Sequence, residues 1–194
     1  GETQRAELGQ QDMSITTPEI QTRTPASQKG KIPSGRGFYQ LEEESLYLPV
    51  EYPSNQKRFY SYLDSDTVSL HFDRAGRLIF IEVNIPRRRW NIKNDFVPPE
   101  IADSDEARFL DFRKSLIDPK VFCDKGKKHL LILFDNQPAK HNIYLAKNLI
   151  AQVTSSGFLT AIWVTDIIDD MAGQKIASWR HLIHKTPLRI PDCA

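Results

Sequence analysis

The sequence predicts a mixed α/β (α+β) domain: an antiparallel hairpin region followed by a strand-helix-strand-helix unit, in one mixed sheet with helices packed on it. Three observations lead to this prediction. Two short apolar runs, at 130–134 and 159–165, flank a stretch with helical spacing. Alternation of apolar and polar residues at 67–73 indicates a half-buried strand before them. Helical spacing returns at 167–184.

Composition and charge are those of an ordinary globular chain. The 194 residues are 40% hydrophobic and 26% charged, which argues against fibrous and wholly disordered classes. The formal net charge of +1 removes the general attraction to nucleic acid or an anionic membrane that a very basic chain has. No apolar run has the length that a bilayer crossing needs. We therefore expect a soluble chain with no membrane-spanning segment and no dedicated nucleic-acid binding.

Three regions are predicted along the chain. Residues 1–37 are rich in Gln, Thr, Ser, Pro and Gly without apolar periodicity, so they are expected to form a disordered tail or tether. In the alternative, Ile15, Ile20 and Ile32 add an irregular strand to the domain. A single domain is expected over 38–190, and a short tail over 191–194.

The first ordered elements are predicted to be strands. The run Leu46-Tyr-Leu-Pro-Val50, followed by Tyr52-Pro53, favours an edge strand, because proline donates no ladder hydrogen bond. A short strand is expected at 58–63. The strand at 67–73 enters a tight turn at 73–76, and the strand at 78–85 is apolar on both faces at its start. This pattern predicts a hairpin whose second strand is central in the sheet.

A helix is predicted over 104–117. Asp103 or Ser104 is suited to cap its first turn. Asp118 ends it, because the residue before a proline avoids the helical region.

The second half is predicted to contain a strand, a helix and a strand. The first strand is the run at 130–134, Asn142 caps the helix that follows, and Gly157 stops this helix just before the strand at 159–165. Short connections of this kind usually form a right-handed crossover between parallel strands. The two strands are therefore expected to lie side by side and point the same way.

The last predicted element is a helix over 167–184, with Asp166 as its candidate cap. His181 and His184 lie three residues apart on it, a spacing at which two histidines can share a metal. Without a third ligand at a recognisable spacing, a solvated helix end is favoured, where cationic side chains also suit the helix dipole.

Several segments, taken in order, match the pattern of a known family. They are Leu48-Pro-Val, Val68-Ser-Leu-His-Phe-Asp-Arg-Ala-Gly-Arg-Leu, the helix from Ser104, Leu130-Leu-Ile-Leu-Phe-Asp, the helix from Asn142, Gly157 and Ala161-Ile-Trp-Val-Thr. Their order resembles the soluble domain of the ExbD/TolR biopolymer-transport family. The transmembrane helix of that family is not among these residues, and 86–103 is longer than its compact domain needs. The resemblance implies a periplasmic domain on a disordered tether that dimerises and contacts partner proteins.

Four aspartates follow the two apolar runs. Asp135 ends the first, and Asp166, Asp169 and Asp170 follow the second. At the carboxyl edge of a parallel sheet they could hold Mg²⁺, with Asp135 and Asp166 as catalytic groups and Asp169 and Asp170 as metal ligands of a hydrolase or phosphotransfer enzyme. Local capping explains the same residues more simply, and no nucleophile motif, P-loop or dinucleotide fingerprint accompanies them.

A basic run, Arg87, Arg88 and Arg89, stands next to Trp90. Guanidinium groups beside an aromatic face suit phosphate or nucleic-acid contact. A solvated hairpin end, or pairing with the acidic residues 42–44, is the favoured alternative.

Cys123 and Cys193 are too few for a disulfide framework and lack zinc-ligand spacing. Free thiols are favoured, and one bridge that ties the C-terminal tail to an exported domain is the alternative.

Taken together, these patterns favour a non-enzymatic binding or protein-interaction module that engages a protein partner or forms a homodimer. The metal-assisted enzyme with Mg²⁺ is the alternative. A signal peptide or anchor before Gly1 would place the domain in the periplasm or otherwise outside the cytoplasm, and a cytoplasmic location is expected without one.

Overall fold

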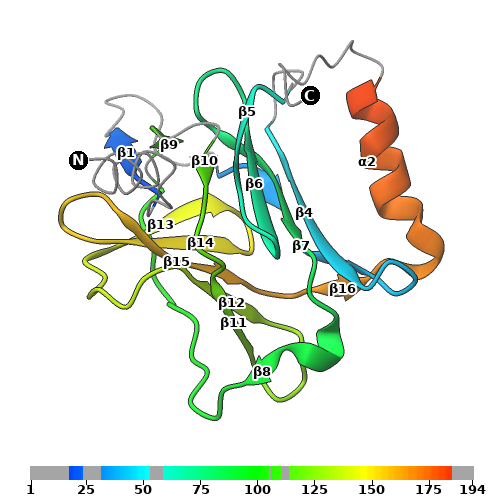
Figure 1. Cartoon of the computed structure of the whole chain (residues 1–194). Helices are drawn as coiled ribbons and strands as arrows, with labels where there is room; N and C mark the ends of the chain where they lie inside the picture. Colours follow the sequence, from blue (N-terminus) through cyan, green and yellow to red (C-terminus); the bar gives the residue numbers. More distant parts are fainter. Residues whose placement is uncertain (1–17, 24–31, 53–58, 105, 111–113, 185–194) are drawn as a thin grey trace, which may run out of the picture.

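The computed structural model describes residues 18–23, 32–52, 59–104, 106–110 and 114–184. Strands make up 46% of the described residues and helical residues 9%. Two sheets face each other, and one longer helix, α2 (Gln174–His184), lies on the outside of the first sheet (Figure 1). The remaining helical residues form two short 3-10 turns, η1 (Arg87–Arg89) and η2 (Met171–Gly173).

The first sheet has eight strands. In spatial order its main path is β10 (Lys114–Ser115), β5 (Ser61–Asp64), β6 (Val68–Phe72), β7 (Leu78–Val83), β4 (Ser45–Glu51), β3 (Phe38–Gln40) and β16 (Ile168–Asp169), and β2 (Ser34–Gly35) pairs with β4 off this path. The pairings are antiparallel except at the two ends, where β10 joins β5 and β16 joins β3 in parallel.

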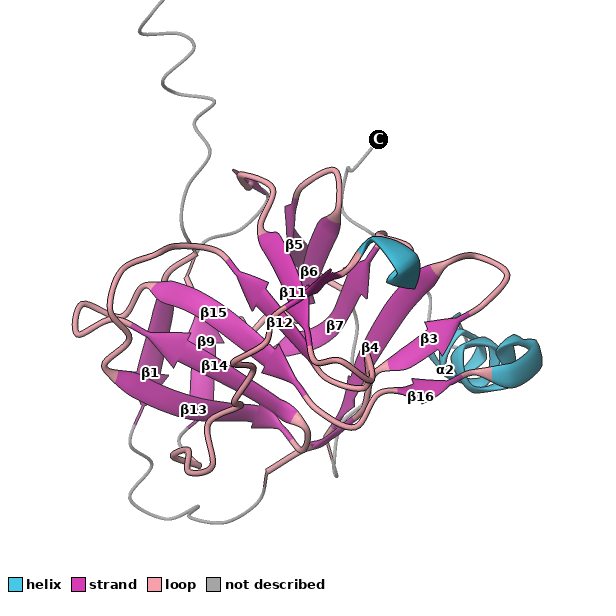
Figure 2. Cartoon of the chain, turned by 90° about the horizontal axis from the view of Figure 1, so that it is seen from below, coloured by secondary structure: helices cyan, strands magenta, loops and turns pink. Residues whose placement is uncertain are grey.

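The second sheet has six strands. In spatial order they are β13 (His141–Ala146), β14 (Leu149–Val153), β15 (Leu159–Val164), β12 (Leu130–Leu133), β11 (Lys120–Cys123) and β8 (Asn91–Ile92). Only β8 is parallel to its neighbour. A separate antiparallel ribbon, β1 (Ile20–Arg23) with β9 (Glu106–Phe109), lies on the side of the molecule away from α2 (Figure 2).

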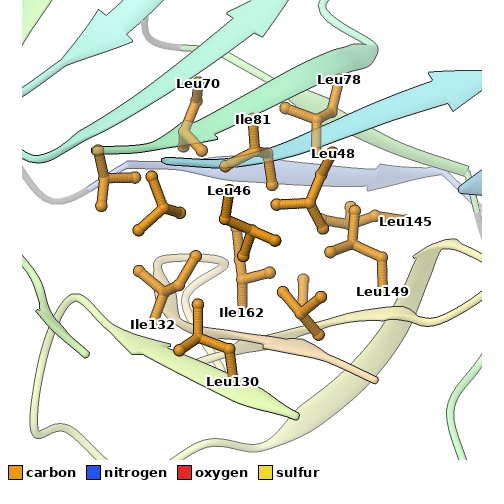
Figure 3. Packing of buried hydrophobic residues seen from close by; sticks show 14 of the residues in the cluster. Leu46, Leu48, Leu70, Leu78, Ile81, Leu130, Ile132, Leu145, Leu149 and Ile162 are labelled. Carbon is orange, nitrogen blue, oxygen red and sulfur yellow. The ribbon is translucent and has the colours of Figure 1, made fainter. Parts of the chain in front are cut away.

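The inner faces of the two sheets form one hydrophobic core (Figure 3). Leu48, Leu70 and Ile81 from the first sheet meet Leu130 and Ile162 from the second, and each is at most 1% exposed. Burial of one such side chain stabilises the fold by about 1.5–3 kcal/mol. The period-two alternation of the strands puts these residues on one face, so the core follows directly from the pattern.

Both sheets contain the same hairpin, displaced by 81 positions in the chain. Leu70 pairs with Ile81 between β6 and β7, and Ala151 pairs with Ile162 between β14 and β15. The register irregularity also recurs, after His71 in the first hairpin and after Gln152 in the second. The fold is therefore an internal duplication at the level of strand pairing.

Both hairpins turn in the same way. Gly76 and Gly157 have φ angles of +82° and +87°, in the left-handed region that glycine enters without steric cost. Their amides donate to the carbonyl oxygens of Asp73 and Thr154, each at 3.0 Å. The side-chain oxygens of Asp73 and Thr154 accept further amides within the turns. Each turn is thus fixed by its own local sequence.

The two halves exchange an edge strand. β8 follows the first hairpin in the chain but pairs with β11 of the second sheet, and β16 follows the second hairpin but pairs with β3 of the first. Ile92 pairs with Cys123, and Asp169 pairs with Tyr39. Because β11 and β3 hold the same place in their sheets, Ile92 and Asp169 are equivalent edge positions.

The outer faces are covered by different elements. On the first sheet, Trp179 of α2 stacks on Phe80 with ring centroids 4.4 Å apart, and Ile176 packs into the same cluster. On the second sheet, the irregular segment 93–104 crosses the face, and Phe96 meets Trp163 edge to face at 5.1 Å.

The predicted helix-packed α/β fold is wrong, because the described residues are mostly β, with two main sheets and the one α-helix α2. The strands at 130–134 and 159–165 are confirmed as neighbours, but they run antiparallel, with Leu130 opposite Val164. No crossover helix joins them. The hairpin at 67–85 and its turn at 73–76 are confirmed.

The segment predicted as a helix from Asn142 instead forms the hairpin of β13 and β14. Its apolar residues fit a helical spacing, but they also alternate on each side of a turn at Lys147 and Asn148. Asn148 adopts φ +66°, which ends the first strand and starts the second. Asn142 caps nothing and instead accepts a hydrogen bond from the Gln152 side chain.

The other helix predictions fail in part. The segment 104–117 holds β9 and β10 in place of a helix. The last predicted helix is confirmed only from Gln174 onward, since the chain before it forms β16 and η2. In the predicted N-terminal tail, Ile20 belongs to β1 and residues 34–35 form β2. Residues 1–17 and 24–31, with Ile15, lie outside the described residues.

Candidate functional site

Asp135 and Asp166 lie at opposite ends of the β12–β15 pair. The paired residues Leu130 to Leu133 span roughly 10 Å, and further residues separate each aspartate from this paired stretch. The amide of Asp135 donates to Thr160 O, and the amide of Asp166 donates to Nδ1 of His129. The predicted shared carboxyl edge required parallel strands, and that premise is wrong.

Asp169 and Asp170 take part in local contacts. Asp169 forms an ion pair with Arg87. Asp170 is buried, and its two carboxylate oxygens accept the amides of Lys175 at 2.9 Å and Ile176 at 3.1 Å. Asp170 therefore caps α2 in the way expected of an aspartate at a helix start.

In the described part of the chain, no group of three or more His, Cys, Asp or Glu side chains is arranged to hold a metal ion. His181 and His184 lie on α2, and their side chains are outside the description. Cys123 is buried, and burial raises the pKa of its thiol. Cys193 lies outside the described residues.

The arginine run forms η1, and its members have different environments. The guanidinium of Arg87 lies over the Tyr39 ring at 4.1 Å and pairs with Asp169. Arg88 pairs with Glu44. Trp90 is 3% exposed and donates its indole N–H to Ile85 O at 3.0 Å. Arg89 is exposed and forms no ion pair with any described carboxylate.

The tertiary structure brings a lysine-rich turn, 124–129, to this arginine turn. Lys127 donates from Nζ to Arg87 O at 3.1 Å. β8 follows η1 directly and pairs with β11, which leads into the lysine turn. We call η1, β8, Lys93 and the turn 124–129 the basic end; η1 and β8 lie together at the bottom of Figure 1.

Cationic charge is concentrated around the basic end. The segments 86–95 and 120–129 hold eight Lys and Arg but only two Asp, in a chain with 26 basic and 25 acidic residues. One of these aspartates, Asp124, accepts the amides of Lys128 and His129 within its own turn. Lys125 and Lys128 are exposed, and among the described residues neither has an ion-pair partner. Arg87 and Arg88 are paired with Asp169 and Glu44, so the excess of cations at this end depends on Arg89 and the lysines.

The backbone of β8 has an open edge. Lys93 donates its amide to Cys123 O at 2.9 Å, so the residues on either side of Ile92 point their backbone groups toward β11. The amide and carbonyl of Ile92 consequently face away from the sheet. Its side chain is 52% exposed. This edge lies directly between Arg89 and Lys93 in the chain.

A separate pocket of about 280 Å³ lies at β2 and the β13–β14 turn. Its charged lining residues are Arg36, Glu51 and Lys147, which carry opposite signs and are exposed. The basic end presents the more uniform charge and is the stronger candidate site.

No protein-family model matches the chain, and no curated protein matches it. Among the described residues, no helix combines the length and the apolar character needed to cross a membrane.

Sequence reasoning identified the arginine run but missed the lysines that complete the basic end. Lys125, Lys127 and Lys128 stand more than 30 positions from Arg89. A local count of basic residues would have found both segments, but only the β8–β11 pairing shows that they share one surface.

Proposed function

We propose that this protein is a non-enzymatic interaction module that binds an anionic protein partner through the basic end. The observation that supports this most directly is the gathering of unpaired, exposed cations from η1 and the turn 124–129. Such a patch attracts acidic partners and speeds their association. Because the net charge of the chain is close to zero, the attraction acts mainly near the basic end. It therefore favours one orientation of the bound partner.

The test uses the full chain and poly-L-glutamate as the acidic probe. A triple variant, Arg89→Glu with Lys125→Glu and Lys128→Glu, reverses the charge of the basic end. We expect its affinity for the probe to fall at least about tenfold, and wild-type binding to weaken as salt rises from about 0.05 M to about 0.5 M. Fluorescence anisotropy of the labelled probe measures both.

The matched control carries the same total charge change at exposed lysines elsewhere, Lys140→Glu with Lys147→Glu and Lys175→Glu. Its affinity should stay within about threefold of wild type, because none of these three lysines belongs to the basic end and exposed charges are screened by salt. Equal losses in the two triple variants would reject the basic end as the binding surface.

A further inference from the structure

The edge strand β8 differs from its equivalent, β16, in a way that points to a ligand. In β16, the residue whose backbone groups face away from the sheet is Asp169, and its side chain forms an ion pair with Arg87. Charged residues at a sheet edge are a common means of preventing pairing with another chain. At β8 the same position is Ile92, apolar and 52% exposed. The first sheet therefore has a guarded edge, whereas the second has an edge suited to pairing.

Resting on the proposed function, we infer that the basic end binds its partner as an extended acidic polypeptide strand that adds to the second sheet alongside β8. The outward amide and carbonyl of Ile92 would pair with the backbone of that strand. One face of the added strand would place apolar residues near the Ile92 side chain. Carboxylates on the strand would meet Arg89, Lys93 and the lysine turn.

Two observations favour a polypeptide over a nucleic acid. The indole of Trp90 is 3% exposed and packs edge to face on Tyr39 at 5.6 Å, so it offers no stacking surface for a base. The open backbone edge is a feature that a peptide backbone matches and a sugar-phosphate backbone does not.

A second copy of this chain matches the basic end less well than an acidic strand does. In antiparallel pairing of β8 with β8 across a two-fold axis at Ile92, Lys93 would lie opposite Asn91, and only Arg89 would meet an acidic residue, Asp95. Asp124 is engaged by its own turn, so such a pairing offers no carboxylate to the lysine turn.

The experiment compares three probes on the full chain. The first is a synthetic peptide of alternating glutamate and valine; the second is the same peptide with every backbone amide N-methylated; the third is oligothymidylate of similar charge. We expect the N-methylated peptide to bind at least about tenfold more weakly than the first, because it keeps the charges but donates no ladder hydrogen bond from either edge. Oligothymidylate should bind more weakly than the first peptide.

Two variants at one position test the same contact from the protein side. Ile92→Pro removes the outward amide of β8 together with the isoleucine side chain, whereas Ile92→Ala removes most of the side chain and keeps this amide, so the difference between the two variants reports on the amide. We expect about tenfold loss of peptide affinity for Ile92→Pro and about threefold loss for Ile92→Ala. Thermal unfolding checks that both variants fold, and the N-methylated peptide supplies the same information if Ile92→Pro does not.

The outcomes separate this inference from the proposed function. Loss of binding in the charge-reversed triple variant, with no effect of N-methylation or of Ile92→Pro, would keep the interaction module and overturn strand addition. Tighter binding of oligothymidylate than of either peptide would overturn the polypeptide partner. Unchanged peptide binding in the triple variant would overturn both.

Discussion

The two sheets share their hairpins and registers but differ on their outer faces. On the first sheet, the outward residues of the hairpin include His71 and Glu82; the equivalent positions of the second sheet hold Gln152 and Trp163. A helix covers the first face, and the segment 93–104 covers the second. Equivalent inward positions are apolar in both, so the shared core fixes the strand pairing while the outward residues select the cover.

The same comparison holds at the edges. Both sheets end in a short parallel strand supplied by the other half, but one edge presents Asp169 and the other presents Ile92. In a duplicated fold, equivalent positions have the same place in the strand pairing. A difference in residue type between them is therefore not required by the strand pairing. These positions are accordingly the ones to examine for function.

The largest expected effect concerns the inward positions. Ile81→Ala and Ile162→Ala each remove a side chain that is 0% exposed at the same place in its sheet. Each should lower the free energy of unfolding by about 3–4 kcal/mol, through lost burial and the cavity that remains. Urea denaturation measures this, with Ile101→Ala, at a site 82% exposed, as a control expected to stay within about 0.5 kcal/mol. A loss below about 1 kcal/mol at one isoleucine would show that the halves do not contribute equally to one core.

The covers should differ in strength. Trp179→Ala removes a side chain that is 8% exposed and stacked on Phe80, and should cost about 3 kcal/mol. Phe96→Ala removes a half-buried ring from the other cover, and should cost about 1–2 kcal/mol. Denaturation curves of the two variants, measured side by side, give the order. The reverse order would mean that the segment 93–104 contributes more to the free energy of unfolding than α2 does.

His71 gives the first sheet a pH dependence at a position where the second sheet holds Gln152. Burial lowers the pKa of His71, although the charge of Asp64 opposes this shift. Below about pH 6.5 the unfolded chain binds a proton that the folded chain resists, so stability should fall as the pH drops through that range.

His71→Gln places the residue of the second sheet at this position and should remove this part of the decline. Unfolding free energies measured between about pH 8 and pH 5 test this. The pKa of Glu82 is raised by burial, so protonation of Glu82 favours the folded state in acid and acts in the opposite direction. A variant that declines as steeply as wild type would exclude His71 as the source.

The smallest effect is expected at the guarded edge. Asp169→Asn breaks an ion pair whose side chains are 43% and 25% exposed, and partly exposed pairs contribute little. We expect a loss of about 0.5 kcal/mol. Urea denaturation measures this loss. Arg88→Gln breaks a more exposed ion pair, and its free energy of unfolding should be within error of wild type. A loss above about 2 kcal/mol for Asp169→Asn would give that pair a structural role beyond guarding the edge.

Much of the strand content could be predicted from local patterns. The hairpin at 67–85 has alternation and a glycine turn that act over a few residues, and the runs at 130–134 and 159–165 are apolar over strand length. The helix prediction for 142–153 is wrong because the apolar residues of this segment fit both the helical period of 3.6 and the strand period of two. A turn at Lys147 and Asn148 decides between them, and this dipeptide is a weaker turn signal than Asn-Gly.

The candidate site was predictable only in part. The arginine run is visible in the sequence, but the burial of Trp90 and the pairing of Arg87 and Arg88 depend on residues far away in the chain. The aspartate cluster depended on strand direction, which hydrophobic patterning does not encode. The 81-residue repetition is not visible in the sequence, because the two hairpins share spacing and burial more than residue identity.

The sequence by itself determined where apolar strands lie and how their hairpins turn, because alternation and glycine conformations act over a few residues. Only the tertiary structure decided that strands 130–134 and 159–165 run antiparallel, that the halves exchange β8 and β16, and that the lysine turn meets η1. These features depend on which backbone groups pair across long distances in the chain, and pairing is settled by the burial of both sheets against each other.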